Sequence, residues 1–493
     1  MLHGSRANTI NLIEDTRSVH PLIRASLISI KLFFVLLSLA LFMAVVTAQV
    51  PNGHFSEKAS EHIINKASYE RVVNSSEIIE KIRMNLPVIY DDVIIRGDLN
   101  LSDLGLPIIH VDRTLINIVS GLSENATKIN SLIRINNSLI EGITNFNNCF
   151  FNNSITFKNT LFKERFTIEG SLFARVVNFQ DSEFSNRVLF RDAWFKKEIC
   201  FNNVIFADRT DFSGSQFDGD TAFVDANFKN TTTFLDSKFN GDAHFDSCQF
   251  SRDTIFSSSA FGISCFNKFS DFSRSVFNES AQFNNIVFAN TVDFRDTIFY
   301  GSLNLESSLF TSDVLFQNAT FMGEINLKRT RWTKLFVRFD SIKDSIAYDP
   351  TAYQLLIKDF NDLGYTDDAN NCYFQFMKQQ LKHRNPMDNP LSFLFDLSAY
   401  VFYGYGIKVT YPIFWSLLSV VIFGDYWRRN GVEDPFRFSA TLFISGTKFF
   451  VEPPDREIKY KGFWLMDMFR IEKILGTIFS VLLFLTLSRL ILK

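Results

Sequence analysis

The sequence predicts a mainly β fold, a solenoid over residues 91–335 with hydrophobic and helical segments on either side. Phenylalanine recurs from Phe146 to Trp332 at alternating steps of five and six residues, so the pattern repeats every eleven. A small or β-branched residue stands two positions before most of these phenylalanines. Asp, Asn, Gly, Ser and Lys fill the intervals. A fixed short period is typical of a solenoid, whose units bury their apolar side only by stacking on one another.

We call the recurring aromatic positions stations. All are Phe except Ile168, Leu305, Leu327 and Trp332, and the rhythm breaks once, where Phe261 to Phe266 is a step of five in place of six. A helix needs apolar residues at steps of three and four, and a flat strand at steps of two. We therefore expect a coil that turns a corner every five or six residues. The predicted core ladder includes Phe190, Phe201, Phe212, Phe223, Phe234, Phe245, Phe256, Phe283 and Phe294.

The residue two before each station is expected to point inward as well. One large and one small side chain on each face would fill a narrow interior at the density of close packing. The residues between stations are those of tight turns. A solenoid of this kind presents a regular surface and has no built-in pocket. The small positions include Ser182, Val188, Ala193, Ile199, Val204, Thr210, Ser215, Thr221, Ala226, Thr232, Ser237, Ala243, Cys248, Thr254 and Ser259.

The alternation resembles the pentapeptide-repeat family in its phenylalanine-rich variety. Runs such as Asp211-Phe212-Ser213-Gly214-Ser215-Gln216-Phe217 and Ala226-Asn227-Phe228 carry this resemblance. It implies a right-handed, quadrilateral β-helix. If two eleven-residue units make one coil, the stations fill roughly eight or nine coils about 4.8 Å apart. The family's functions do not transfer with the fold.

Both ends of the solenoid need covers because a terminal coil exposes unpaired backbone. Residues 50–90 are expected to form a helical N-terminal cap, with one or two amphipathic helices over residues 56–86. The aliphatic residues that follow are expected to form the first coils or a strand cap; they are Val93, Ile95, Leu99, Leu101 and Leu104. After the solenoid, residues 345–392 predict a helical hairpin linker with its turn at Leu363-Gly364-Tyr365.

Three stretches are apolar enough to enter a membrane: residues 27–48, 409–427 and 474–492. The first ends in the small residues Val46-Thr47-Ala48, so residues 1–48 form either a signal peptide or a membrane anchor, an N-terminal hydrophobic helix in both cases. The second is bracketed by aromatic residues, as in an aromatic belt; they are Tyr400, Tyr403, Tyr405, Tyr411, Tyr426 and Trp427. The third is long enough to cross a bilayer, with Arg489 near enough to its end to snorkel. Residues 393–493 thus predict a two-transmembrane module.

Loop charge predicts the orientation of this module. The segment between the last two spans is rich in cations: Arg428, Arg429, Arg437, Lys448, Arg456, Lys459, Lys461, Arg470 and Lys473. Positive-inside bias places that loop in the cytoplasm and the repeat domain outside it. Glycosylation sequons occur only in the predicted outer part; they are Asn74, Asn100, Asn125, Asn136, Asn152, Asn230, Asn278 and Asn318. The expected location is a membrane with a multi-pass chain and an extracytoplasmic repeat domain.

The C-terminal module resembles a degenerate two-transmembrane potassium-channel pore domain. Gly404-Tyr405-Gly406-Ile407-Lys408 leads into one span, Phe438-Ser439-Ala440-Thr441-Leu442-Phe443 stands where a pore helix would be, and Glu472-Lys473-Ile474-Leu475-Gly476 opens the last span. A potassium filter needs a strand with two glycines whose carbonyls replace the hydration shell of the ion. The degenerate filter region here, Ser445, Gly446 and Thr447, has one glycine and is followed by Lys448. These departures weigh against selective cation conduction.

Composition excludes several classes of function. With 50 basic and 53 acidic residues the chain is nearly balanced, which leaves no basic stripe for nucleic acid and no strongly negative rod of the kind that mimics DNA. The five cysteines lack metal spacing, and Cys149 and Cys248 are expected to be buried thiols. His110 and His244 stand alone. Acidic pairs such as Asp218/Asp220 and Asp242/Asp246 sit at turns, where turn hydrogen bonds explain them.

The sequence therefore predicts no catalytic residue, no metal ligand and no cofactor-binding residue, and no enzymatic activity. The expected function is a membrane-anchored, extracytoplasmic structural or interaction scaffold. The expected partners are the lipid bilayer and another protein, a surface layer or further copies of the chain, but no nucleic acid. The alternative is an ion-channel-like membrane protein with the solenoid as a regulatory domain.

Overall fold

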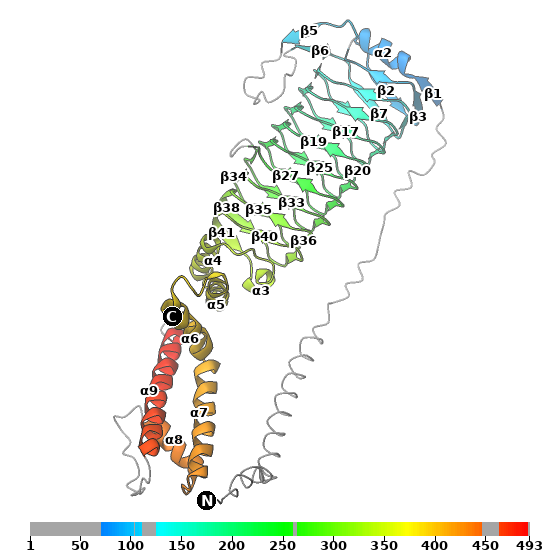
Figure 1. Cartoon of the computed structure of the whole chain (residues 1–493). Helices are drawn as coiled ribbons and strands as arrows, with labels where there is room; N and C mark the ends of the chain where they lie inside the picture. Colours follow the sequence, from blue (N-terminus) through cyan, green and yellow to red (C-terminus); the bar gives the residue numbers. More distant parts are fainter. Residues whose placement is uncertain (1–70, 103, 111–124, 260–263, 446–462, 492–493) are drawn as a thin grey trace, which may run out of the picture. The chain divides into compact units, whose positions relative to one another are not determined.

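The computed structural model describes residues 71–102, 104–110, 125–259, 264–445 and 463–491 (Figure 1). Residues 71–336 form a mainly β solenoid of about eleven turns, in which one strand per turn joins an 11-stranded sheet. The strands of this sheet are β1 (Arg71–Asn74), β3 (Val93–Arg96), β8 (Leu139–Ile140), β12 (Leu161–Phe162), β16 (Glu183–Phe184), β20 (Ile205–Phe206), β24 (Asn227–Phe228), β28 (Gln249–Phe250), β32 (Val276–Phe277), β36 (Ile298–Phe299) and β39 (Thr320–Phe321).

Two further sheets complete the coils. The 10-stranded sheet contains β4 (Leu99–Asn100), β9 (Thr144–Asn145), β13 (Phe166–Thr167), β17 (Val188–Leu189), β21 (Thr210–Asp211), β25 (Thr232–Thr233), β29 (Thr254–Ile255), β33 (Ala281–Gln282), β37 (Leu303–Asn304) and β40 (Ile325–Asn326). The 20-stranded sheet contains β2 (Val88–Asp91), β5 (Ile108–His110), β6 (Asn125–Ile129), β7 (Ile133–Asn136), β10 (Cys149–Phe151), β11 (Ile155–Thr156), β14 (Leu172–Phe173), β15 (Val177–Asn178), β18 (Trp194–Phe195), β19 (Ile199–Cys200), β22 (Gln216–Phe217), β23 (Thr221–Ala222), β26 (Lys238–Phe239), β27 (Ala243–His244), β30 (Cys265–Phe266), β31 (Ser270–Asp271), β34 (Val287–Phe288), β35 (Val292–Asp293), β38 (Leu309–Leu315) and β41 (Arg331–Phe336). Among the described strands, the pairs are parallel except β5 with β6.

The stations stack inside the solenoid in four columns. Rings one coil apart, such as Phe212, Phe234 and Phe256, lie face to face with centroids 4.7 Å apart and planes within 2°. The columns contain Phe151, Phe173, Phe195, Phe217, Phe239, Phe266, Phe288 and Phe310; Phe157, Phe179, Phe201, Phe223, Phe245, Phe272, Phe294 and Phe316; Phe162, Phe184, Phe206, Phe228, Phe250, Phe277, Phe299 and Phe321; and Phe190, Phe212, Phe234, Phe256 and Phe283. Among the described residues, every station except the partly buried Trp332 belongs to the buried core, as predicted.

Two turns in each coil pass through left-handed backbone. This position recurs every eleven residues, for example at Asn203 (φ 57°), Gly214 (φ 70°) and Asp225 (φ 58°). Asn, Asp and Gly adopt a positive φ at lower cost than other residues. The polar residues between stations are therefore turn residues, as the sequence predicted. Two eleven-residue units make one 22-residue coil, so Asn203 lies one coil after Asp181 and donates a hydrogen bond to its carboxylate.

One coil is longer than the others, and this corrects the reading of the rhythm. Phe266 stacks on Phe239, 27 residues before it, with centroids 4.5 Å apart. Neighbouring pairs such as Gln249 with Val276 keep the same offset of 27. The coil thus carries a five-residue insertion, and the column continues at Phe266 instead of Phe261, which lies outside the described residues. Ser259, predicted to point inward two positions before Phe261, is exposed; the other small positions of that series are buried.

The first turn is closed by helix α2 (Ser75–Arg83), which buries Ile78 and Ile82. The sequence predicted one or two helices over residues 56–86, but Arg71–Asn74 form strand β1. The β-branched residues Val72 and Val73 pair in parallel with Ile94 and Ile95 of β3, and this pairing outweighs helix formation. Residues 56–70 and 1–48 lie outside the described residues. The aliphatic lead-in forms first coils, with Val93, Ile95, Leu99 and Leu101 buried.

The last turn is closed by α3 (Phe339–Ile342) and a helical hairpin. The hairpin consists of α4 (Pro350–Asp362) and α5 (Thr366–His383), joined at Gly364 with a φ of 75°, as predicted. Two carboxylates of the hairpin accept hydrogen bonds from backbone at the end of the coil: Asp359 from Leu335 N at 3.0 Å and Asp368 from Phe339 N at 3.1 Å. Two backbone donors at the otherwise unpaired edge of the solenoid are thereby satisfied.

The remaining described residues form a helical module: α6 (Pro390–Tyr403), the short 3₁₀ helix η1 (Gly404–Gly406), α7 (Thr410–Arg429), α8 (Pro435–Ser445) and α9 (Phe463–Ile491) (Figure 1). The hydrophobic stretches predicted at residues 409–427 and 474–492 overlap α7 (Thr410–Arg429) and α9 (Phe463–Ile491), respectively. The chain bends by 111° between the α6–η1 segment and α7, at Gly404 and Gly406, whose φ angles are 53° and 73°.

Candidate functional site

The interior of the solenoid is filled by its own side chains. The predicted ladder residues Phe190, Phe201, Phe212, Phe223, Phe234, Phe245, Phe256, Phe283 and Phe294 are each at most 1% exposed. These rings form the core and cannot contact a ligand. Any site on the solenoid is therefore built from outward-pointing residues.

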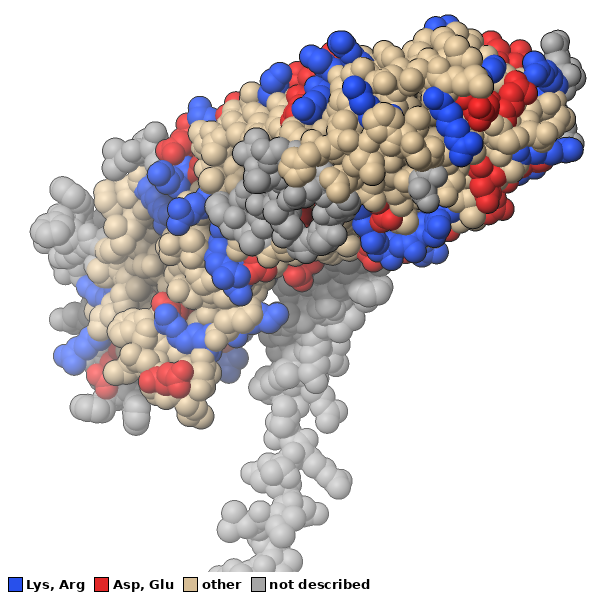
Figure 2. Space-filling view, turned by 90° about the horizontal axis from the view of Figure 1, so that it is seen from above, with Lys and Arg blue, Asp and Glu red and all other residues tan. Residues whose placement is uncertain are grey.

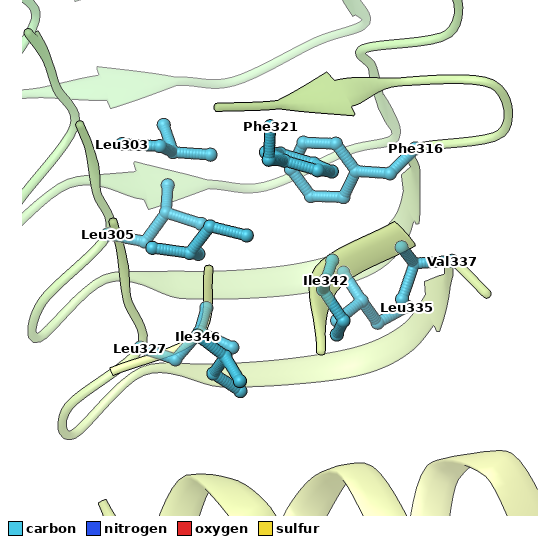
Figure 3. Close-up of a pocket in the computed structure, with 10 residues that line it drawn as sticks. Leu303, Leu305, Phe316, Phe321, Leu327, Leu335, Val337, Ile342 and Ile346 are labelled. Carbon is cyan, nitrogen blue, oxygen red and sulfur yellow. The ribbon is translucent and has the colours of Figure 1, made fainter. Parts of the chain in front are cut away.

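One small cavity lies at the C-terminal end of the column, which corrects the expectation that the solenoid has no pocket (Figure 3). Leucine replaces phenylalanine at two stations there, Leu305 and Leu327, and α3 contributes Ile342. The side chains that line it are all apolar: Leu303, Leu305, Phe316, Phe321, Ile325, Leu327, Leu335, Val337, Ile342 and Ile346. A ligand site normally also offers a few polar groups that fix orientation. We interpret this cavity as an imperfectly filled end of the core.

Most acidic residues singled out in the sequence have structural partners. Asp218 accepts hydrogen bonds from Trp194 Nε1 at 2.6 Å and from Asn240 Nδ2 at 2.7 Å. Asp220 accepts from Asp242 N at 3.0 Å, and Asp242 in turn accepts from Phe269 N at 3.1 Å. These contacts tie successive coils together, as expected of turn residues.

The cysteines are free thiols. Cys149 and Cys248 point into the core, as predicted, and burial raises the pKa of the Cys149 thiol to about 12. A buried thiol with a raised pKa is inert, because the thiolate is the reactive form.

One cluster was missed by the sequence analysis. His244, Asp246 and Asp271 come together on the outer surface, with ligand-type atoms all within 4.8 Å of one another. His244 was predicted to stand alone, but Asp271 is its partner one coil on, because this coil has 27 residues. Recognising the insertion between Phe256 and Phe266 would have aligned the two positions. His110 lies on β5, outside this cluster.

The outer surface of the solenoid carries both signs of charge. On the face shown in Figure 2, basic and acidic residues are interspersed among uncharged ones. Several form pairs between coils, such as Arg191 with Asp211 at 2.8 Å and Arg274 with Asp246 at 3.0 Å. This mixed pattern differs from the single-sign stripe typical of a nucleic-acid-binding surface.

The helical module presents a different surface, which is apolar. Long aliphatic and aromatic side chains of α6, α7 and α9 are 36–73% exposed; they are Leu391, Leu394, Phe395, Leu397, Ile413, Phe414, Leu417, Val421, Ile422, Ile471, Ile474, Ile478, Val481, Phe484, Leu485 and Leu487. We call this set the apolar helical surface. An exposed apolar surface of this extent marks a protein or membrane contact. Residues Asp467–Arg489 of α9 are long and apolar enough to cross a membrane. Helices α6 and α7 reach that length and hydropathy only when the bent pair is taken together.

The inside of the module is polar at one point. The Glu472 carboxylate of α9 is fully buried and accepts hydrogen bonds from Trp427 Nε1 of α7 at 2.7 Å and from Ser439 Oγ of α8. Ser439 Oγ also lies 3.0 Å from the Val420 carbonyl oxygen. One carboxylate therefore joins three helices. Trp427, predicted to belong to an aromatic belt, is buried against Glu472, and Tyr405, predicted for the other end of that belt, is buried as well.

Two glycines let α8 lie close to its neighbours. A Cβ on Gly424 of α7 would lie 2.3 Å from Phe436 Cδ1, and one on Gly476 of α9 would lie 2.1 Å from the Phe443 carbonyl oxygen. Helix α8 thus packs between α7 and α9, where the sequence placed a pore-like helix. Ser445 is its last residue, and Gly446 and Thr447 of the degenerate filter region lie outside the described residues.

The C-terminal end of α9 is fastened to the linker. Arg489 Nη1 donates to the Tyr405 carbonyl oxygen at 3.2 Å, and its guanidinium lies 4.6 Å from the centre of the Tyr373 ring. Lys408 Nζ, just before α7, donates to Asn371 Oδ1 at 3.0 Å. The C-terminal end of α9 and the N-terminal end of α7 therefore lie together beside α5.

The cap at the end of the solenoid makes stability depend on pH. Burial raises the pKa of Asp359 from 3.8 to about 6. Between pH 4 and pH 6 the folded protein therefore binds more protons than the unfolded chain. The contribution of this group to stability is complete below about pH 4 and is lost as the pH rises through about 6. We expect Asp359→Asn to reduce the change in the free energy of unfolding between pH 4 and pH 7 by about 1–2 kcal/mol, because solvent partly screens this group. Thermal unfolding at pH 4 to 7 measures it, with the exposed Asp344→Asn as the control. Equal pH profiles for wild type and Asp359→Asn would contradict the assignment.

Comparison with known proteins supports the identity of the repeats. The family model described as pentapeptide repeats (9 copies) matches residues 272–320 and 283–331. The matched region lies within the described coils and includes stations of all four columns, so the chain contains pentapeptide repeats. The match includes no part of the helical module. No curated protein and no solved structure matches the chain.

Proposed function

We propose that this pentapeptide-repeat chain is a membrane-anchored scaffold whose solenoid acts outside the cytoplasm as a structural or interaction surface without catalytic activity. The proposal rests chiefly on the apolar helical surface. The solenoid buries its apolar side chains, whereas α7 and α9 expose many of theirs, with Phe484 70% and Leu417 64% exposed. Hydrocarbon is the environment in which such a surface is favourable. The resemblance to pentapeptide repeats adds the expectation of a right-handed, quadrilateral coil.

In this proposal α7 and α9 form a membrane hairpin. Both helices start or end beside α5, through Lys408 and Arg489. The solenoid and the C-terminal end of α9 would then share one side of the bilayer, and the basic segment between residues 428 and 473 the other. Positive-inside bias assigns that segment to the cytoplasm. The absence of catalysis remains part of the proposal, supported by a surface whose acids act mainly in turn and inter-coil contacts.

Charges placed on the apolar helical surface test the anchor. We expect Val481→Asp/Phe484→Asp to abolish co-flotation of residues 49–493, which lack the hydrophobic stretch at residues 27–48, with phosphatidylcholine vesicles. Each central charge adds about 2.5–3.5 kcal/mol to the free energy of insertion. Met322→Asp is the matched control, because Met322 is a 60% exposed apolar residue of the solenoid. Flotation of the double variant at the wild-type level would contradict membrane anchoring by α9.

Glycan mapping tests the orientation. Asn230 and Asn278 are exposed sequons on the coils, so translation into microsomes should add glycans there if the repeats are outside the cytoplasm. A sequon introduced between residues 446 and 462 serves as the opposite control. Modification of the introduced sequon alone would place the repeats in the cytoplasm and overturn that part of the proposal.

A channel-like function is the second candidate, favoured by one observation. Helix α8 packs between α7 and α9, as the resemblance to a two-transmembrane pore domain expects of a pore helix. Conductance across planar bilayers separates the two candidates. The scaffold proposal predicts no current from the purified chain, whereas a cation current abolished by Gly446→Ala would favour the channel.

A further inference from the structure

The cluster of His244, Asp246 and Asp271 combines three metal-binding side chains from two successive coils. His244 is the last residue of β27 (Figure 1), Asp246 follows two residues later, and Asp271 of β31 is the register partner of His244. All three are half-buried, and their ligand-type atoms lie within 4.8 Å of one another. Ligand atoms on one Zn²⁺ lie roughly 3–4 Å apart, given bonds of about 2 Å. Rotation of the side chains is enough to close this cluster around an ion.

In the neighbouring coil, the aspartate at the equivalent position is paired with an arginine. Asp293 occupies the position equivalent to Asp271, and Arg295 binds its carboxylate with Nε at 2.9 Å and Nη2 at 2.6 Å. The residue equivalent to Arg295 in the Asp271 coil is Ser273. The backbone is the same in both coils, because Ser273 N and Arg295 N each donate to the aspartate two residues before at 2.9 Å. The Asp271 coil thus lacks the arginine that neutralises Asp293.

The charges around the cluster leave one carboxylate without a counter-charge. Three carboxylates, those of Asp246, Asp271 and Asp293, face two guanidinium groups, Arg274 on Asp246 and Arg295 on Asp293. No hydrogen bond from a ring nitrogen of His244 is present among the described residues. The Asp271 Oδ1 atom accepts from Ser273 N, so the imidazole of His244 and the second carboxylate oxygen of Asp271 remain available to a common ion.

We propose that His244, Asp246 and Asp271 form a binding site for a divalent transition-metal ion, with Zn²⁺ as the best-matched member of the class. One imidazole nitrogen and two carboxylate oxygens suit zinc better than calcium or magnesium, which prefer oxygen ligands alone. Three protein ligands leave the remaining coordination position to water. The site joins two coils next to the five-residue insertion and is independent of membrane anchoring.

Zinc titration of the full chain in detergent tests this proposal. Protein stripped with chelator and dialysed is titrated with ZnCl₂ against a competing fluorescent chelator. We expect one more zinc site in the wild type than in His244→Gln or Asp271→Asn, with affinity at that site lowered at least about tenfold in each variant. The other histidines contribute equally to all samples, so the difference isolates this cluster.

Ser273→Arg is the sharpest variant because it removes no ligand. It recreates the Asp293–Arg295 arrangement on Asp271, so we expect loss of zinc affinity with an unchanged melting temperature in the absence of metal. The double variant Asp293→Asn/Arg295→Gln keeps the net charge and all three ligands, and it should bind zinc like the wild type. Equal zinc stoichiometry and affinity in the wild type, His244→Gln and Ser273→Arg would overturn the proposal.

Discussion

Replacing Phe234 with alanine is expected to lower the free energy of unfolding by about 3–5 kcal/mol. The ring is 1% exposed and lies between Phe212 and Phe256, with centroids 4.7 Å away on both sides. It also contacts Phe245 of the next column edge to face at 5.4 Å. Truncation would leave a cavity between rings that the rigid coils cannot close, since each ring is held by the register of its strand.

Urea unfolding followed by far-ultraviolet circular dichroism measures this loss. Lys229→Ala, five residues before Phe234, is the control because Lys229 is exposed, and it should change stability by less than about 0.5 kcal/mol. Phe234→Leu should fall between the two variants, since it removes less volume. A loss below about 1 kcal/mol for Phe234→Ala would mean that the ring is not packed as the columns require.

Replacing Glu472 with alanine is expected to destabilise the helical module by about 1–3 kcal/mol, the cost of one unsatisfied buried donor. The change removes the acceptor of Trp427 Nε1, whereas Ser439 Oγ keeps the Val420 carbonyl oxygen as an acceptor. Since the three partners lie on α7, α8 and α9, the loss should loosen α8 most. Glu472→Gln retains one acceptor oxygen and should lose less.

Thermal unfolding of the full chain in detergent, read by tryptophan fluorescence, reports this change because Trp427 is itself a partner of Glu472. Ile474→Ala is the control on the same helix, where the side chain is 58% exposed. If Glu472→Ala and Ile474→Ala melted at the same temperature, Glu472 would not tie the helices together.

Much of the solenoid could be predicted because its signal is local and repeated. The step of five and six requires corners, and each station tests the same pattern again, so the inward position of residues such as Phe212 and Ser215 followed from spacing alone. The hairpin turn at Gly364 was likewise predicted from a short local motif. A periodic sequence leaves few alternatives to a coil.

The features that were missed depend on contacts between distant residues. The five-residue insertion carries its own phenylalanine, Phe261, and therefore imitates the local rhythm; only the stacking of Phe266 on Phe239 exposes it. The cluster at His244 was hidden for the same reason. Trp427 was assigned to the membrane surface because its buried partner, Glu472, is 45 residues away. Strand β1 was read as helix because its pairing with β3 is not visible in its own composition.

Disulfide trapping across the insertion tests the coil register most directly. In a background with Cys200 and Cys265 changed to serine, Gln249→Cys is combined with either Val276→Cys or Asp271→Cys. Gln249 and Val276 are register partners on adjacent parallel strands, at a separation compatible with a disulfide. We predict rapid oxidative cross-linking of the 249–276 pair and none of the 249–271 pair. Cross-linking of the 249–271 pair instead would contradict the 27-residue coil and the ring columns that continue through it.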